Sequence, residues 1–249
     1  MSIKTNLIKK IAGFTSRQLN KDMQQAEACQ EKVFQRLIQQ AQNTAFGKDH
    51  GFHKIKTYQD YKQQVALRDY EGLKTYIDLL KEGQSNILWP GKPRYFAKTS
   101  GTTSGAKFIP LSKASIPNHF GTARNAVFYY IHRYQRAEFM DGKMIFLSGS
   151  PALDEHNGIP TGRLSGISNH LIPSWLKSSQ LPSYPTNCID AWEDKLDAIV
   201  EETVGQDLRM ISGIPPWVQM YYEKLLDYTG KTTILEVFPN LSLFVYGGV

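Results

Sequence analysis

The sequence predicts an α/β fold in which a helical N-terminal region is followed by a mostly parallel sheet flanked by helices. Residues 1–90 carry apolar side chains at helical spacing, whereas from residue 91 onward short apolar runs alternate with helical patterns. We therefore expect a helical framework over residues 1–90 and an α/β subdomain over residues 91–249. The chain has 249 residues, 41% of them hydrophobic, which is enough to bury a sizeable core.

The helical framework begins with two amphipathic patterns. One apolar face flanked by lysines lies near the N-terminus and consists of Ile3, Leu7, Ile8, Ile11 and Phe14. Packing on the protein body is the commoner fate of such a face, and binding to a membrane surface is the alternative. Gln18 to Gln42 then predict one long amphipathic helix, which ends before Gly47.

Two shorter helices complete this framework. Thr57 and Asp60 have the spacing of a capping box, which predicts a helix that runs to about Val65. Gly72 to Lys81 predicts a second helix, and Gly83 closes it.

The helices of the α/β region are indicated by their caps. Ser112 can cap a helix that runs through Asn118 to about Arg136, and Asp190 with Glu193 can cap another to about Gly205. A further helix opens at Pro215 and runs to about Tyr228. Residues 152–187 hold many Gly, Pro and Ser residues, so we expect an irregular binding loop with a short helix near residues 171–177.

Three strands separated by these helices predict the parallel sheet, at residues 143–147, 208–212 and 241–246. Each strand runs into small or turn-forming residues: Ser148-Gly149-Ser150, Ser212-Gly213-Ile214 and Tyr246-Gly247-Gly248. Ligands of such sheets bind beyond the carboxyl ends of the strands. We therefore expect the three ends to converge on one pocket, and ordinary strand-to-loop turns are the alternative.

The segment from Thr99 to Lys107 combines glycines, five hydroxyls among residues 99–104 and a lysine. Arg94 to Lys98 before it and Phe108 to Pro110 after it predict short strands, so the segment should be the tip of a hairpin. Glycine lets a backbone approach a ligand closely, and amides, hydroxyls and an ammonium bind phosphate oxygens. A polyphosphate-binding loop is the functional interpretation, and a solvated Ser/Thr/Gly turn is the structural one.

A Walker-type phosphate loop is excluded by spacing. That motif needs a glycine directly before the lysine, a hydroxyl after it and a helix beyond. Here Ala106 precedes Lys107, Phe108 follows it, and Pro110 blocks an immediate helix. Kinases and GTPases of the Walker type are therefore not expected.

The order Thr-Ser-Gly-Thr-Thr, followed by a lysine after three intervening residues, resembles the phosphate-loop signature of the adenylate-forming superfamily. Within it the chain is most similar to the Gretchen Hagen auxin-responsive family of acyl-acid amido synthetases, including its bacterial members. Further matching segments are residues 44–48, 69–71, 76–77, 83–88, 146–151, 162–167, 212–217, 238–241 and 246–249. Ser104 separates the Thr-Thr pair from Gly105, a departure from the broader superfamily that leaves the individual amide contacts open.

The resemblance implies the N-terminal part of the large domain of an adenylate-forming enzyme, truncated at its C-terminal end. It implies a ligase that uses ATP and Mg²⁺ to convert a carboxylic acid to an acyl adenylate and then transfers the acyl group to an amino acid. The family's later motifs, including the magnesium ligand, are expected beyond Val249, so this chain alone is expected to be inactive. An acyl-CoA ligase and an inactive nucleotide-binding or interaction module are the alternatives.

The resemblance also assigns site residues. Lys107 would assist departure of pyrophosphate, as the catalytic residue. The phosphates would be bound by Thr99, Ser100, Gly101, Thr102, Thr103, Ser104 and Gly105. The acyl or adenine pocket would be formed by Arg124, Ile214, Pro215, Tyr246, Gly247, Gly248 and Val249. For Arg124, which could bind an acidic group of the substrate, a solvated surface position is the alternative.

Composition excludes several other classes. Cys29 and Cys188 stand apart, and His50 and His53 have no acidic or cysteine cluster beside them, so neither a disulfide framework nor a metal site is expected. The net charge of +6 suits anionic small molecules, but the basic residues are scattered rather than arranged in a nucleic-acid-binding stripe. No apolar run is long enough to span a bilayer, and we expect a cytoplasmic protein.

Overall fold

A computed structural model describes residues 3–99 and 105–247 of the chain. The chain divides into two compact units, each assembled from separated segments. Unit 1 comprises Met1–Thr15, Ala126–Ala152 and Ser165–Val249, and unit 2 comprises Ser16–Asn125 and Leu153–Leu164. Each unit contains helices and one four-stranded sheet, so the predicted α/β class is confirmed.

The sheet of unit 1 is entirely parallel. Its strand order is β6-β3-β7-β8, formed by Gln180–Leu181, Lys143–Phe146, Leu208–Ser212 and Leu243–Val245. The central pair aligns Ile145 with Ile211 and Phe146 with Ser212, and β8 continues the register with Val245 beside Ser212. The three strands expected from the sequence are therefore present and parallel.

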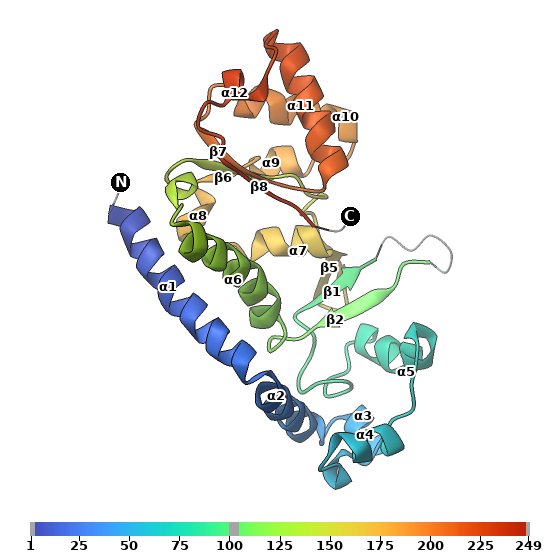
Figure 1. Ribbon diagram of the computed structural model, residues 1–249. Helices are drawn as coiled ribbons and strands as arrows, with labels where there is room; N and C mark the ends of the chain where they lie inside the picture. Colours follow the sequence, from blue (N-terminus) through green and yellow to red (C-terminus); the bar gives the residue numbers. More distant parts are fainter. Residues whose placement is uncertain (1–2, 100–104, 248–249) are drawn as a thin grey trace. The chain divides into compact units, whose positions relative to one another are not determined.

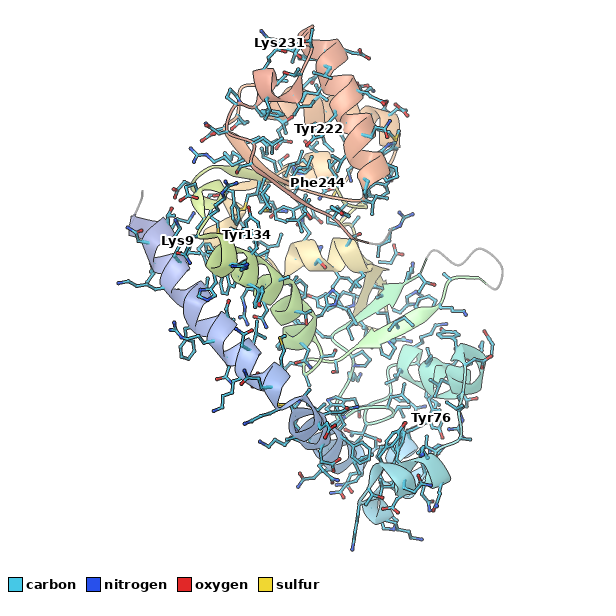
Figure 2. All side chains as sticks on the ribbon, in the orientation of Figure 1. Lys9, Tyr76, Tyr134, Tyr222, Lys231 and Phe244 are labelled. Carbon is cyan, nitrogen blue, oxygen red and sulfur yellow. The ribbon has the colours of Figure 1, made fainter. Side chains whose placement is uncertain are left out.

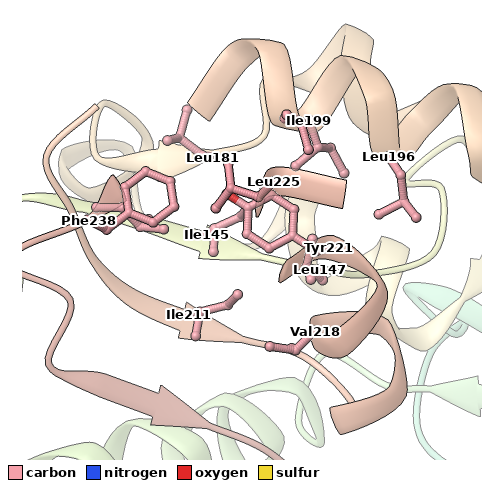
Figure 3. Packing of buried hydrophobic residues seen from close by; sticks show 12 residues of the cluster. Ile145, Leu147, Leu181, Leu196, Ile199, Ile211, Val218, Tyr221, Leu225 and Phe238 are labelled. Atoms are coloured by element: carbon pink, nitrogen blue, oxygen red, sulfur yellow. The ribbon is translucent and has the colours of Figure 1, made fainter. Parts of the chain in front are cut away.

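Helices cover both faces of this sheet (Figure 1). One face is covered by the helices α10, Trp192–Thr203, and α11, Pro215–Thr229. There Ile145 and Ile211 of the sheet pack with Tyr221 and Leu225 of α11 (Figure 3). The neighbouring residues Met144 and Met210 point to the other face, because side chains alternate along a strand. There they pack with residues of α1, Ile3–Gln24, and α6, Ile116–Tyr134.

The ends of α11 and α10 illustrate one success and one error of the sequence interpretation. Proline opens α11 at its first position, as predicted, and Gly230 ends it in a left-handed conformation with φ of +64°. The capping role expected of Asp190 is wrong, because the residue before α10 is Ala191, which makes no side-chain cap.

Unit 2 contains a mixed sheet of order β2-β1-β5-β4. Its strands are Phe108–Leu111, Tyr95–Lys98, Ile159–Arg163 and Asp154–His156. β1 and β2 form the predicted antiparallel hairpin, in which Lys98 pairs with Phe108. On its other edge β1 pairs in parallel with β5, so β2 is an edge strand of the sheet.

The expectation of an irregular loop over residues 152–187 is wrong. This stretch contains β4, β5 and β6 and the short helices α7, Leu164–His170, α8, Ser174–Lys177, and α9, Tyr184–Asn187. Ile159 and Thr161 of β5 are buried, and the strand is stabilised by hydrogen bonds to β1, more than sixty residues earlier. Such non-local pairing leaves little trace in the composition of the segment itself.

The N-terminal helices also differ from expectation. The helix predicted over residues 18–42 is two helices, because α1 runs to Gln24 and α2 spans Ala26–Ala41. Gln25 interrupts them with a non-helical conformation, φ −117° and ψ 34°. Of the side chains of the apolar face near the N-terminus that the structure describes, Ile8 is buried, whereas Leu7 and Phe14 are 57% and 68% exposed, so packing on the protein body is confirmed for Ile8.

The shorter helices of unit 2 follow their local signals. After α3, Ala45–Asp49, and the 3₁₀ turn Phe52–Lys54, the predicted capping box of Thr57 and Asp60 opens α4, Tyr58–Gln64. Helix α5, Tyr70–Lys81, begins two residues earlier than expected because Asp69 caps it. Gly83 ends α5 with φ of +86°, as predicted.

Candidate functional site

The base of the β1–β2 hairpin is fixed by two hydrogen bonds between Thr99 and Lys107. The amide of Thr99 donates to the carbonyl of Lys107 at 3.0 Å, and the amide of Lys107 donates to the Thr99 hydroxyl at 3.3 Å. Gly105 has φ of +81°, a backbone conformation that residues with a side chain rarely adopt, so this position favours glycine. Ser100, Gly101, Thr102, Thr103 and Ser104, also predicted to bind phosphate, lie outside the described residues.

The lysine of the hairpin lies against an aromatic ring from another element. The Nζ of Lys107 is 5.3 Å from the ring centroid of Tyr70, the first residue of α5. The Tyr70 hydroxyl accepts a hydrogen bond from the amide of Phe108 at 2.8 Å. In the sequence, Tyr70 lies within a segment that resembles the family, residues 69–71, and has no predicted place in the site.

The other lysine at this end of the sheet is paired with an acid. Lys98, the last residue of β1, forms an ion pair with Asp154 of β4, and its hydrogen bond to that carboxyl holds the pKa of Asp154 below its ordinary value. Among the described residues, no acidic side chain forms an ion pair with Lys107. Lys107 is therefore available to bind an anion at the hairpin.

The carboxyl ends of β3, β7 and β8 in unit 1 surround one open hollow of about 460 Å³. Its walls are Leu147, Ser148, Ser165, Ser212, Gly213, Ile214, Trp217, Val245, Tyr246 and Gly247. The prediction that these strand ends converge on one pocket is confirmed for the described residues. A volume of this size is within the range of small-molecule sites.

Four of the wall residues were not anticipated as site residues: Leu147 and Val245, which end or precede the predicted strand ends, and Ser165 and Trp217. Trp217 lies in the first turn of α11, three residues after Ile214, and its ring centroid is 4.7 Å from that of Trp192. Ser165 is contributed by α7, in the stretch that was expected to be irregular. The Pro-Pro-Trp sequence at the start of a predicted helix was the available signal for Trp217.

A buried lysine supports one wall of the hollow. Lys195 of α10 is 3% exposed, and its Nζ donates to the carbonyl of Ser148 at 3.0 Å and to that of Asn187 at 2.7 Å. A buried ammonium is costly unless it is hydrogen-bonded, so these carbonyls are held in fixed positions. Sequence reasoning missed Lys195 because it looks like a solvated lysine of an amphipathic helix.

The remaining predicted residues are distributed as follows. Pro215 opens α11 but is not among the residues that line the hollow. Arg124 lies on α6 and donates to the side-chain oxygen of Asn125 at 3.2 Å. Gly248 and Val249 fall outside the described residues.

The described residues give no indication of a metal site or a membrane span. Between residues 3–99 and 105–247, no three His, Cys, Asp or Glu side chains are grouped to hold a metal ion. His50 instead stacks on Phe46, with ring centroids 4.1 Å apart, and bonds to its carbonyl at 2.8 Å. No helix in this part of the chain is long and apolar enough to cross a bilayer.

Comparison with known proteins adds the family. The sequence model of the GH3 family N-terminal domain matches residues 15–180, which include the whole β1–β2 hairpin. The chain belongs to the GH3 family. This is the Gretchen Hagen family whose resemblance was noted in the sequence, and no curated protein matches the chain significantly.

Two solved structures share the fold. One is described as AtGH3.15 acyl acid amido synthetase in complex with 2,4-DB, with 17% identity and a TM-score of 0.58 over 80% of this chain and 34% of that one. The other, GH3.15 acyl acid amido synthetase, has 16% identity and a TM-score of 0.59 over 85% of this chain and 40% of that one. This GH3-family chain thus spans well under half the length of either relative.

Proposed function

We propose that this protein is an ATP-dependent ligase that activates a carboxylic acid as its acyl adenylate. The hairpin between β1 and β2 carries the proposal, because it presents Lys107 and a hydroxyl-rich segment within the part of the chain that matches the GH3 family. Formation of an acyl adenylate requires in-line attack of a carboxylate on the α-phosphate of ATP. Catalysis of such a step is mostly positioning and neutralisation of phosphate charge.

The hairpin has the chemistry for that neutralisation. The hydroxyl of Thr99 and the ammonium of Lys107 can bind phosphate oxygens, and no atom of the described residues lies within 4 Å of the position where a Cβ of Gly105 would stand. Lys107 would stabilise the charge that develops on departing pyrophosphate. Ser100, Gly101, Thr102, Thr103 and Ser104 are proposed to complete the phosphate-binding set.

The hollow at the strand ends of unit 1 has the chemistry to bind an apolar or aromatic group. Ile214, Trp217 and Tyr246 give it apolar and aromatic walls, and Ser148 and Ser212 add hydroxyls for orientation. We assign it to the acyl group or the adenine, with Gly247 allowing a flat ligand to lie against the backbone. Pro215, Gly248 and Val249 are proposed to adjoin it, and Arg124 to bind an acidic group of the substrate.

The second step is proposed from the family. Both structural relatives carry the description acyl acid amido synthetase, which supports transfer of the activated acyl group to the amine of an amino acid. Mg²⁺ would accompany ATP and shield its phosphates. A reaction that uses these metabolites fits a cytoplasmic protein, and we propose that location.

The proposal is tested by exchange of radiolabelled pyrophosphate into ATP, using the protein as its gene encodes it and a panel of carboxylic acids. Acid-dependent exchange is expected, because formation of an acyl adenylate is reversible. ATP binding without exchange for any acid would contradict the proposal and favour an inactive nucleotide-binding module. Where exchange occurs, supplying amino acids or coenzyme A in turn distinguishes amide from thioester formation.

A further inference from the structure

We propose that Tyr70 is a positioning residue that holds Lys107 for binding the polyphosphate of ATP. This inference rests on the proposed function and extends it to α5, an element outside the hairpin. Tyr70 contacts two consecutive residues, Lys107 and Phe108, the first residue of β2. Its hydroxyl accepts the Phe108 amide, and its ring lies beneath the Lys107 ammonium.

The hydrogen bond has a specific structural reason. β2 is the edge strand of its sheet, so one row of its backbone groups has no partner strand. In the hairpin, the carbonyl of Lys107 faces β1 and accepts the Thr99 amide at 3.0 Å. The next amide, that of Phe108, is satisfied by the Tyr70 hydroxyl at 2.8 Å. Tyr70 therefore fixes the backbone directly after Lys107.

The ring contact restricts the side chain. A lysine on a hairpin has four rotatable bonds and loses rotamer freedom when it binds a phosphate. An ammonium 5.3 Å from an aromatic centroid is attracted by the ring's negative face. That attraction keeps the charge over one surface without neutralising it, so the ammonium can still accept a phosphate oxygen as a partner.

The position of Tyr70 is itself well determined. Tyr70 is the first residue of α5, and the preceding Asp69 caps the helix by accepting the amide of Gly72 at 2.8 Å. At its other end α5 buries Ile77 and Leu80. A rigid helix terminus thus supports a residue of the hairpin, as pre-organised binding sites require.

The experiment measures the affinity of the chain for ATP, AMP and inorganic tripolyphosphate by titration calorimetry, for the parent and for two variants. Tyr70→Phe removes the hydroxyl and keeps the ring, and Tyr70→Leu removes both. We expect Tyr70→Phe to lower the affinity for ATP and for tripolyphosphate about three- to tenfold, the equivalent of one lost hydrogen bond. Tyr70→Leu should lower both affinities further. AMP affinity should stay within about twofold, because AMP lacks the β- and γ-phosphates.

A matched control lies on the same helix. Tyr76, labelled in Figure 2, donates its hydroxyl to the carboxylate of Asp49 at 2.7 Å. Tyr76→Phe keeps the ring and removes from α5 one tyrosine hydrogen bond whose partner, Asp49, lies outside the hairpin, so its ATP affinity should equal that of the parent. Far-UV circular dichroism of each variant establishes that the fold is kept.

The outcomes separate this inference from the function it rests on. A parent chain that binds neither ATP nor tripolyphosphate overturns both. A parent that binds them, with folded Tyr70 variants of unchanged or increased affinity, overturns the positioning role alone, and an increase would mean that the ring withholds Lys107 from the ligand. An equal loss of AMP and ATP affinity in Tyr70→Phe also overturns it, because the role would then be structural.

Discussion

Gly166 of α7 packs so closely on the segment after β3 that an added methyl group cannot fit. A Cβ at this position would lie 2.5 Å from the carbonyl oxygen of Ser150 and 3.0 Å from the Cα of Pro151. Ordinary contact begins at about 3.4 Å, so helix and segment would have to separate by about 0.9 Å. Both contacting atoms belong to the backbone, which cannot turn aside as a flexible side chain can.

The expected free-energy change of Gly166→Ala is the difference of two effects. Overpacking of this kind costs about 3 kcal/mol at the upper end of its usual range. Alanine regains about 1 kcal/mol over glycine in a helix. We therefore expect Gly166→Ala to lower the free energy of unfolding by about 2 kcal/mol.

Gly121 of α6 provides the matched control, because a Cβ there would meet only the Arg124 side chain, at 3.8 Å. The same substitution should stabilise the protein by about 0.5 to 1 kcal/mol at this position. Urea unfolding followed by circular dichroism and tryptophan fluorescence measures both changes. Changes of the same sign at the two glycines, or an unchanged Gly166→Ala, would refute the packing argument.

Three further substitutions test other features. Leu225→Ala, in the fully buried core of unit 1, should cost about 2 to 5 kcal/mol in urea unfolding, and a loss below about 1 kcal/mol would contradict its place in that core. The hydrogen bond that Glu138 accepts from Lys9 at 2.9 Å lowers the pKa of Glu138 below its ordinary value of 4.5. The pair therefore stabilises the fold above pH 4.5, and this stabilisation is lost as the pH falls through the lowered pKa. Glu138→Gln should reduce the fall in unfolding free energy between about pH 5 and 3 by no more than about 0.5 kcal/mol, because the pair is partly exposed. Identical pH dependence in parent and variant would contradict this effect. Lys195→Met should lower the unfolding free energy by about 1 to 3 kcal/mol, because the Ser148 carbonyl loses a donor, and equal stability would show that this bond is dispensable.

The elements that were predicted correctly have local causes. The capping box at Thr57 and the proline that opens α11 act within one helical turn, so their signals lie within a few residues. The β1–β2 hairpin was also predictable, because two short apolar runs flank a glycine-rich segment. The convergence of three strand ends followed from the rule that parallel strands share one edge.

The elements that were missed depend on distant partners. β5 is held by β1, Lys195 donates to a carbonyl 47 residues away, and Tyr70 meets an amide 38 residues away. Nothing in the residues near each of these positions specifies such a partner. The break at Gln25 was missed for a different reason, since the apolar spacing continues across it and only the backbone dihedral angles depart from helical values.

The central claim is that the hairpin from Thr99 to Lys107 binds the polyphosphate of ATP, and Lys107→Ala tests it most directly. The matched control is Lys113→Ala, which removes an exposed lysine from the turn after β2. Titration of both variants with ATP should show a loss of at least about tenfold for Lys107→Ala and less than about twofold for Lys113→Ala. Stability should change by no more than about 0.5 kcal/mol in either. Equal ATP affinity in parent and Lys107→Ala would contradict the claim.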